Sequence, residues 1–319
     1  MPERAAAHTA AIAAHADWSI DPRKRWVTVA AREGAGWRMC AARPVGPVAD
    51  FLPGLLAEAR GGAVALGVDL PVGLPRAYAA RLQAADFPAF LCGLGGWPDF
   101  FAVCERVEEV RLDRPFYPRR GVRGMTRAAH AAALGLGGPE GLSRLCDRAT
   151  ADRPAGAPLF WTLGANQSGK AAIAAWREML LPALAGASPP RLWPFEGPLL
   201  SLLAPGRVVL AETYPAEALR HLGLRMGGSK RRQSDRVALA GALRDRMAAL
   251  GAVPDPAQAA ALRDGFGADA AGEDRFDSLL GLLCLLTVLA GARPDTAPAD
   301  PWITRWEGWV LGQTALPRA

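Results

Sequence analysis

The stretch Ala63-Val64-Ala65-Leu66-Gly67-Val68-Asp69 is a continuous apolar run that ends in an acid. Such a run is typical of a parallel strand buried on both faces of a sheet. Gly61 and Gly62 come directly before it and are expected to end a helix over residues 48–60. A rigid loop with two prolines follows at residues 70–75. The run therefore predicts an α/β fold in which Asp69 lies at the carboxyl end of a buried strand.

Strand signals also precede and follow this run. Before it, residues 14–20, 25–32 and 36–40 are expected to form three strands in succession, which are antiparallel by default. After it, Val208-Val209-Leu210-Ala211-Glu212 is a second apolar run that ends in an acid. This order predicts a mixed five-stranded sheet with helices on both faces.

The remaining segments predict helices and one irregular insertion. Ser234 is a plausible cap for one of these helices, and Pro182 is expected to end another. Residues 93–169 are rich in Pro, Gly, Arg and aromatics, and we interpret them as a large insertion into a single domain that spans 1–319. The expected helices cover residues 170–181, 234–250 and 273–290.

Composition narrows the class of protein. The chain has 319 residues, and 50% of them are hydrophobic, which is enough for a sizeable core. Its net charge of +6 favours an anionic partner only weakly. The five cysteines form no Cys-x-x-Cys pair, which argues against a zinc site and indicates reduced thiols in a cytoplasmic protein. The most apolar run, residues 279–290, is shorter than the roughly 20 residues of a membrane span. We therefore expect no membrane segment, and we leave the oligomeric state open.

Several acids occupy positions that a sheet edge and a helix face would bring together. Asp17 lies on the first strand, whereas Asp69 and Glu212 end buried strands, where open α/β sheets bind their ligands. Asp277 lies in the first turns of the last helix, with Asp274 three residues before it on the same face. Carboxylates in one pocket repel one another, and Mg²⁺ or Mn²⁺ relieves that repulsion. We therefore interpret four acids as catalytic and metal-binding, with Asp274 as a further metal ligand: Asp17, Asp69, Glu212 and Asp277.

Each of these acids also has a simpler interpretation. Asp69 can cap the turn that precedes Pro71, and Glu212 can pair with a nearby arginine. Asp274 and Asp277 lie near the start of a helix, where acids interact favourably with the helix dipole. The case for a site therefore depends on the acids taken together.

The same residues carry a family resemblance that covers almost the whole chain. The matching segments are Asp17-Trp18-Ser19, Gly67-Val68-Asp69-Leu70-Pro71-Val72-Gly73-Leu74-Pro75, Ala211-Glu212-Thr213-Tyr214-Pro215-Ala216-Glu217, Gly228-Ser229-Lys230-Arg231, Gly272-Glu273-Asp274-Arg275-Phe276-Asp277 and Glu307-Gly308-Trp309-Val310-Leu311-Gly312. In these segments the chain resembles the bacterial protein family of unknown function numbered 429, which is described as predicted nucleases with a ribonuclease-H fold. The resemblance implies a ribonuclease-H-like fold and an acidic site. Trp18 stands where the family often has a small residue, and we expect it to crowd the site or to stack on a base.

Basic residues are candidates for substrate contact. Lys170 opens a predicted helix but lacks the upstream glycine of a nucleotide-binding P-loop. Lys230 and Arg231 belong to the densest basic run. We expect these three residues to contact the substrate, and the alternative for each is a solvated surface position. A second basic run lies beside aromatic residues, a pattern that suits a nucleic-acid strand: Arg119, Arg120 and Arg123 with Phe116 and Tyr117.

Three functions follow from these features. The first is a metal-dependent phosphodiesterase, a nuclease that cuts DNA or RNA with Mg²⁺ or Mn²⁺. The second is a non-catalytic module that binds nucleic acid or protein on the same fold. The third is phosphoryl transfer from ATP by an actin-like protein, although the paired glycine-rich phosphate loops of that class are not evident. Ser/His/Asp catalysis has no nucleophile elbow to support it.

Overall fold

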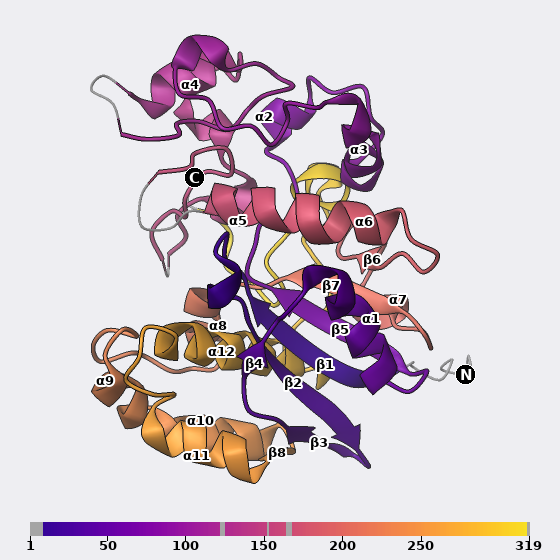
Figure 1. The fold of residues 1–319 in the computed structure, drawn as a ribbon, viewed down its shortest axis with the longest axis vertical. Helices are drawn as coiled ribbons and strands as arrows, with labels where there is room; N and C mark the ends of the chain where they lie inside the picture. The colour runs from indigo at the N-terminus through magenta and orange to yellow at the C-terminus, as the bar shows by residue number, and fades with distance from the viewer. Residues whose placement is uncertain (1–8, 122–124, 152, 164–167, 318–319) are drawn as a thin grey trace. The chain divides into compact units, whose positions relative to one another are not determined.

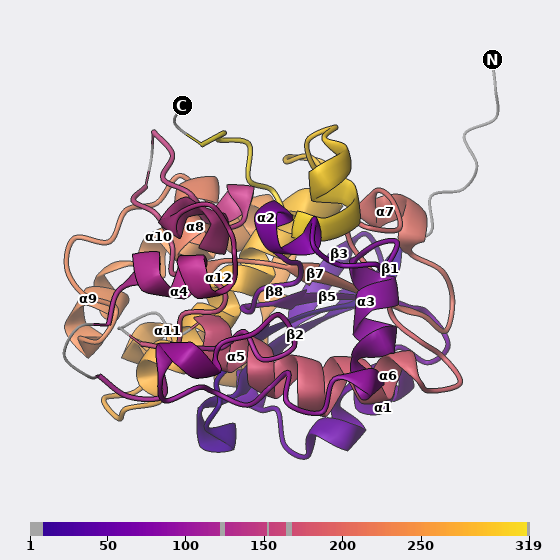
Figure 2. The same ribbon diagram turned by 90° about the horizontal axis from the view of Figure 1, so that it is seen from above.

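The computed structural model describes residues 9–121, 125–151, 153–163 and 168–317. The described part excludes the N-terminal residues 1–8 and, within the expected insertion, residues 122–124, 152 and 164–167. The chain divides into two compact units, and each is described by itself (Figures 1 and 2). The first unit comprises Met1–Asp69, Ala187–Thr296 and Val310–Gln313, and the second comprises Leu70–Gly186, Ala297–Trp309 and Thr314–Ala319.

An eight-stranded mixed sheet forms the core of the first unit (Figure 1). The strands are β1 (Ala10–Asp17), β2 (Trp26–Glu33), β3 (Gly36–Met39), β4 (Arg43–Pro44), β5 (Ala63–Val68), β6 (Arg191–Leu192), β7 (Val208–Glu212) and β8 (Ala252–Pro254). Their order is β6-β7-β5-β1-β2-β3-β8, and β4 pairs with β2. β2 is antiparallel to β1 and β3, whereas β1, β5, β7 and β6 are parallel to one another.

The α/β class is confirmed, but the expected number of five strands is wrong, because the sheet has eight. The five expected strands are present as β1, β2, β3, β5 and β7, with the expected directions. The additional strands β4, β6 and β8 are two or three residues long. Segments this short carry no visible alternation of apolar and polar residues, so the sequence pattern misses them.

The first hairpin is longer than a tight turn. β1 begins at Ala10 and ends at Asp17, earlier than the expected residues 14–20. The connection to β2 contains a single 3-10 turn, Pro22–Lys24, which is capped by Asp21. The Asp21 carboxylate accepts the Arg23 backbone N–H at 3.0 Å, which fixes the turn between the two strands.

Helices cover both faces of the sheet. α12 (Gly272–Leu289) lies against β1 and β2, and residues 276–288 are all buried, which confirms the predicted core helix. α1 (Val48–Glu58) lies on the opposite face (Figure 2). No helix among the described residues is both long and apolar enough to span a bilayer. The other helices of this unit are α7 (Leu199–Leu202), α8 (Pro215–His221), α9 (Gln233–Ala238), α10 (Ala240–Ala249) and α11 (Pro256–Asp264).

The helix expected over residues 234–250 is two helices, α9 and α10, and Ser234 does not cap it. Arg232 occupies the N-cap position, and Ser234 lies inside α9. α9 ends at Ala238, and Gly241 is the second residue of α10. The break itself lies at Leu239, which follows α9 and precedes α10.

The second unit contains short helices joined by long irregular segments. Its helices are α2 (Arg76–Ala79), α3 (Phe87–Gly93), α4 (Arg127–Ala133), α5 (Ser168–Ala175) and α6 (Leu181–Leu184). Pro182 does not end the predicted helix, because a π-helical turn at Trp176–Leu180 joins α5 to α6. Pro182 then lies in the first turn of α6, where the missing N–H of proline costs nothing.

Candidate functional site

Asp17 and Asp69 lie side by side at the carboxyl edge of the sheet. Asp17 is the last residue of β1, and Asp69 directly follows β5. The Asp69 backbone N–H donates to the Ala16 carbonyl at 3.0 Å, which extends the parallel ladder by one step. Side chains at matching positions of neighbouring parallel strands point to the same face. Two acids from distant segments therefore share one face of the sheet.

Helix α12 brings a third acid to this face. His15 shares the face of Asp17, two residues along β1, and its Nδ1 lies 3.1 Å from the Ser278 carbonyl oxygen. The Ser278 hydroxyl lies 2.6 Å from the hydroxyl of Thr28, the partner of His15 on β2. These contacts hold α12 against the face that carries Asp17. Asp277 directly precedes Ser278 and therefore lies in the same region.

Two glycines allow this close packing. A Cβ at Gly281 of α12 would lie 2.1 Å from His15 Nε2, so only glycine at this position lets the helix lie this close to the ring. A Cβ at Gly67 of β5 would lie 3.0 Å from the His15 ring and from the Thr213 methyl group. His15 is fully buried, and burial lowers its pKa to about 3, which leaves the ring neutral. The position of Asp277 therefore depends on an uncharged His15 between two glycines.

Burial and nearby negative charges raise the pKa of the acids on this face. Burial raises the pKa of Asp17 well above its usual value, and the charges of Asp277 and Asp69 add to the shift. Burial, followed by the charge of Asp277, raises the pKa of Asp69 to about 7. Burial is also the main cause that raises the pKa of Asp277, and it raises that of Asp274 to about 6. We call these four residues, Asp17, Asp69, Asp274 and Asp277, the carboxylate cluster.

Lys230 supplies a positive charge inside the carboxylate cluster. Its Nζ donates to Asp277 Oδ2 at 2.5 Å. Burial opposes the charge on Lys230, but the carboxylates of Asp277 and Asp69 outweigh it and raise the lysine pKa. The Arg236 guanidinium donates to the Lys230 carbonyl and to the Gly267 carbonyl, the latter at 2.6 Å, which fixes the loop that carries the lysine. The cluster is thus partly neutralised by one ammonium group.

Glu212 points away from the carboxylate cluster. It pairs in register with Val68, one residue before Asp69. Because side chains alternate along a strand, Glu212 projects to the face opposite Asp69. Its charge still contributes to the raised pKa of Asp69. The register therefore separates Glu212 from the other acids that the sequence groups with it.

Trp18 also lies on the opposite face, and the expectation that it crowds the acidic site is wrong. It follows Asp17, and its ring packs against Phe51 of α1 at 6.3 Å between centroids. The Arg25 guanidinium lies 4.7 Å from the centre of the same ring. Only 6% of Trp18 is exposed, so its ring is used in packing and is not available to stack on a base.

The donor set of the carboxylate cluster fits a hard divalent cation. Carboxylate oxygens are the ligands that Mg²⁺ and Mn²⁺ prefer. Asp277 Oδ1 is buried without a hydrogen-bond partner among the described residues, and a cation would satisfy it. No three of the cluster's acids, all of them within the described ranges, bring one oxygen each within 4.8 Å of one another. Ligation of one ion by three of them therefore requires carboxylate rotation and release of the Lys230–Asp277 pair.

The other predicted substrate contacts lie in different surroundings. Arg231 is an exposed residue next to Lys230, and its Nε lies 3.6 Å from the Glu273 carboxylate. Lys170 is the third residue of α5 and belongs to the second unit. Of the three, the structure brings only Lys230 into the carboxylate cluster.

Four residues around the cluster are not identified by the sequence pattern. Three of them are His15, Thr28 and Ser278, which join β1, β2 and α12. The fourth is Thr213, whose hydroxyl is buried and has no partner in the described part of the chain. His15 precedes Asp17 by two residues and Ser278 adjoins Asp277, so strand periodicity and adjacency are the signals that could have found them.

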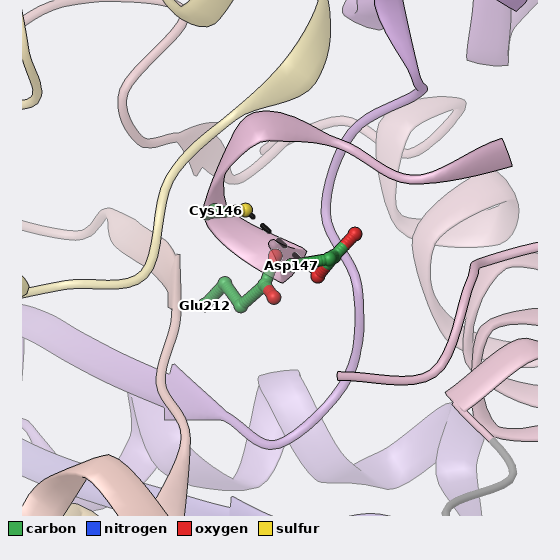
Figure 3. Close-up of side chains that lie close together, drawn as sticks. All are labelled: Cys146, Asp147 and Glu212. Carbon is green, nitrogen blue, oxygen red and sulfur yellow. Dashed lines mark hydrogen bonds between the residues drawn. The ribbon is translucent and has the colours of Figure 1, made fainter. Parts of the chain in front are cut away.

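Figure 3 shows Glu212 at the end of β7, together with Cys146 and Asp147 of the second unit. Within that unit, Cys146 Sγ donates to Asp147 Oδ1 at 4.0 Å, and the Arg144 guanidinium donates to the same oxygen at 2.9 Å. Asp147 therefore already has a cationic partner. Glu212 belongs to the first unit, and we assign no site to these three residues.

The raised pKa of Asp69 predicts a pH-dependent stability. An aspartate with a folded-state pKa of about 7 binds more protons than its unfolded form, whose pKa is 3.8. Its stabilising protonation is complete below about pH 4 and is lost as the pH rises through about 7. We expect the free energy of unfolding in EDTA to fall across this range, and to fall less in Asp69→Asn. Urea unfolding from pH 4 to 8 measures this, and parallel curves for the two proteins would contradict it.

No protein-family model, curated protein or solved structure matches this chain. Its resemblance to the family numbered 429 therefore stays a hypothesis. The function has to be argued from the geometry and charge of the carboxylate cluster itself.

Proposed function

We propose that the protein is a divalent-metal-dependent phosphodiesterase, a nuclease that acts on DNA or RNA. The observation that carries the proposal is the meeting of Asp17, Asp69 and Asp277 on one face of the sheet. They come from β1, the end of β5 and α12. Burial raises the pKa of each, and the charge of Asp277 raises that of Asp17 and Asp69 further. Buried acids gathered in this way destabilise the folded protein unless a cation binds them. Their position therefore indicates a functional role.

The strand order supports a ribonuclease-H-like arrangement of the central sheet. The five longest strands follow the order β3-β2-β1-β5-β7, with three antiparallel strands on one side and two parallel strands on the other. This agrees with the fold that the resemblance to the family numbered 429 implies. In an open sheet of this kind, the carboxyl edge is the place where ligands bind.

The residues of the carboxylate cluster have separate parts in the proposed reaction. Asp17, Asp69 and Asp277 would hold Mg²⁺ or Mn²⁺, and Asp274, with its pKa raised to about 6, would add charge beside them. The bound metal would activate water and stabilise the leaving oxygen of the phosphodiester. The role of Glu212 is limited to its charge, because it faces the other side of the sheet.

Lys230 is suited to hold the scissile phosphate. Its ammonium group lies inside the cluster and pairs with Asp277. A lysine released from a carboxylate by an incoming cation becomes a donor for a phosphate oxygen. Arg231 adjoins it at the surface, where its side chain is 80% exposed, and would contact a neighbouring phosphate.

The test of the proposal is the metal dependence of cleavage. The purified chain is incubated with end-labelled single- and double-stranded DNA and RNA, in EDTA and with Mg²⁺ or Mn²⁺. We expect internal cleavage of at least one substrate with Mg²⁺ or Mn²⁺ and none in EDTA. Cleavage that persists in EDTA, or no cleavage of any substrate with either metal, would contradict the proposal.

A further inference from the structure

A basic hollow in the second unit is a separate feature. Its volume is about 310 Å³, and it is lined by Ala102, Val103, Arg114, Arg119 and Lys170. Three of these five residues carry a positive charge, none is acidic, and none is aromatic. The three positive charges therefore favour an anionic ligand.

Backbone hydrogen bonds hold two of the lining segments together. The Cys104 N–H donates to the Phe116 carbonyl at 2.8 Å, and the Arg119 N–H donates to the Cys104 carbonyl at 2.8 Å. The segment that contains Phe116 continues this pairing, because the Tyr117 N–H donates to the Phe160 carbonyl at 3.0 Å. Arg119 is thus attached to a framework of buried backbone.

Lys170 is brought to the same place by the start of α5. Gly169 lies so close to the chain before it that a Cβ would be 2.3 Å from the Leu159 carbonyl oxygen. The close approach ties the first turn of α5 to the segment next to Phe160, which pairs with Tyr117. The fold therefore brings Lys170 and Arg119, which are far apart in the sequence, to the same hollow.

The acids near the hollow are too few to neutralise it. Glu105 lies 3.4 Å from Arg119 and is shared with Arg120 at 3.5 Å. Glu109 lies 3.8 Å from Arg114 and is shared with Arg106 at 3.3 Å. Two glutamates thus form ion pairs with four arginines. The described residues provide no ion-pair partner for Lys170, so the lining keeps an excess of positive charge.

Arg114 contributes charge to the lining. Its side chain is 26% exposed, and its ion-pair partner Glu109 lies as far away as 3.8 Å.

We infer that this hollow binds a phosphate group, with Lys170 and Arg119 as its main contacts and Arg114 as a further positive charge. The phosphate can belong to a nucleic-acid strand or to a small molecule, since both present the same oxygens. The inference does not rest on the proposed hydrolysis. It can therefore be tested in EDTA, where no metal-dependent cleavage occurs, and its outcome is independent of the carboxylate cluster.

The test compares Lys170→Gln and Arg119→Gln with a matched control, Arg177→Gln. Arg177 is an exposed cation of the same unit that pairs with Glu178 at 3.1 Å and does not line the hollow. One arm measures binding of a fluorescent single-stranded oligonucleotide in EDTA, over a range of salt concentrations. The other arm measures binding of inorganic phosphate by calorimetry. Thermal unfolding shows whether each variant keeps its fold.

We expect Lys170→Gln and Arg119→Gln each to weaken binding of at least one probe by roughly 5-fold, the loss of one charge-assisted contact. If the probe is the oligonucleotide, each variant should also lower the salt dependence by about one counterion. The Arg177→Gln variant should bind within twofold of wild type. An effect on the oligonucleotide assigns the site to a nucleic-acid strand, and an effect on phosphate alone assigns it to a small phosphorylated ligand. Unchanged binding of both probes in folded variants, or an equal loss in Arg177→Gln, would overturn the inference.

Discussion

Asp69→Asn should abolish metal-dependent cleavage, with a loss of roughly 100-fold or more in kcat/KM. Asn keeps the shape of the side chain but removes the negative charge at the junction of Asp17 and Asp277. The charge of Asp277 raises the pKa of Asp69, because the two carboxylates repel each other. Removal of the Asp69 charge relieves this repulsion and should not unfold the protein. Cleavage of an end-labelled oligonucleotide with Mg²⁺ and with Mn²⁺ measures the effect.

The matched control for this variant is Asp245→Asn. Asp245 is an exposed aspartate of α10 in the same unit. The substitution removes the same charge from the surface, and activity should stay within twofold of wild type. If Asp69→Asn retains wild-type activity, or if Asp245→Asn loses as much as Asp69→Asn, the assignment of Asp69 fails.

Gly281→Ala should lower the free energy of unfolding by roughly 2–4 kcal/mol, because the added methyl overlaps the His15 ring. A Cβ at this position would lie 2.1 Å from Nε2, 2.2 Å from Cε1 and 2.3 Å from Cδ2. The ring is fully buried, and a Cβ at neighbouring Gly67 would lie 3.0 Å from it, so the ring has little room to move aside. α12 must shift instead, and Asp277 shifts with it. Metal-dependent cleavage should therefore fall together with stability.

The control for the helix itself is Gly241→Ala on α10. A Cβ at Gly241 meets nothing within 4 Å, so only the better helix propensity of alanine remains. This variant should be unchanged or more stable by up to about 1 kcal/mol. Urea unfolding of both variants, and of His15→Ala combined with Gly281→Ala, separates the two effects. Equal stabilities for the two glycine variants, or strictly additive effects of His15→Ala and Gly281→Ala, would contradict the overlap.

The sequence predicts the central strands of the sheet because two apolar runs end in acids. Val68-Asp69 and Ala211-Glu212 look alike as strings of residues, and both do end parallel strands at the carboxyl edge. The sequence does not show the register between them. Val68 pairs with Glu212, so Asp69 stands one step further along, and that single step places the two acids on opposite faces.

Other features depend on contacts that no local pattern encodes. The place of Asp277 follows from the fit of α12 over His15, which joins residues distant in the sequence. The strands β4, β6 and β8 exist only as partners of longer strands. Pro182 is accommodated by a π-helical turn that precedes it, whereas sequence rules expect proline to end a helix.

The most direct test of the central claim is a crystal structure of the protein soaked in Mn²⁺, with anomalous difference maps. We expect a peak on the α12 face of the sheet, with oxygens of Asp17, Asp69 and Asp277 at roughly 2–2.3 Å and Lys230 displaced from Asp277. If saturating Mn²⁺ gives no peak at these three side chains and leaves the Lys230–Asp277 pair intact, the three acids do not form a metal site.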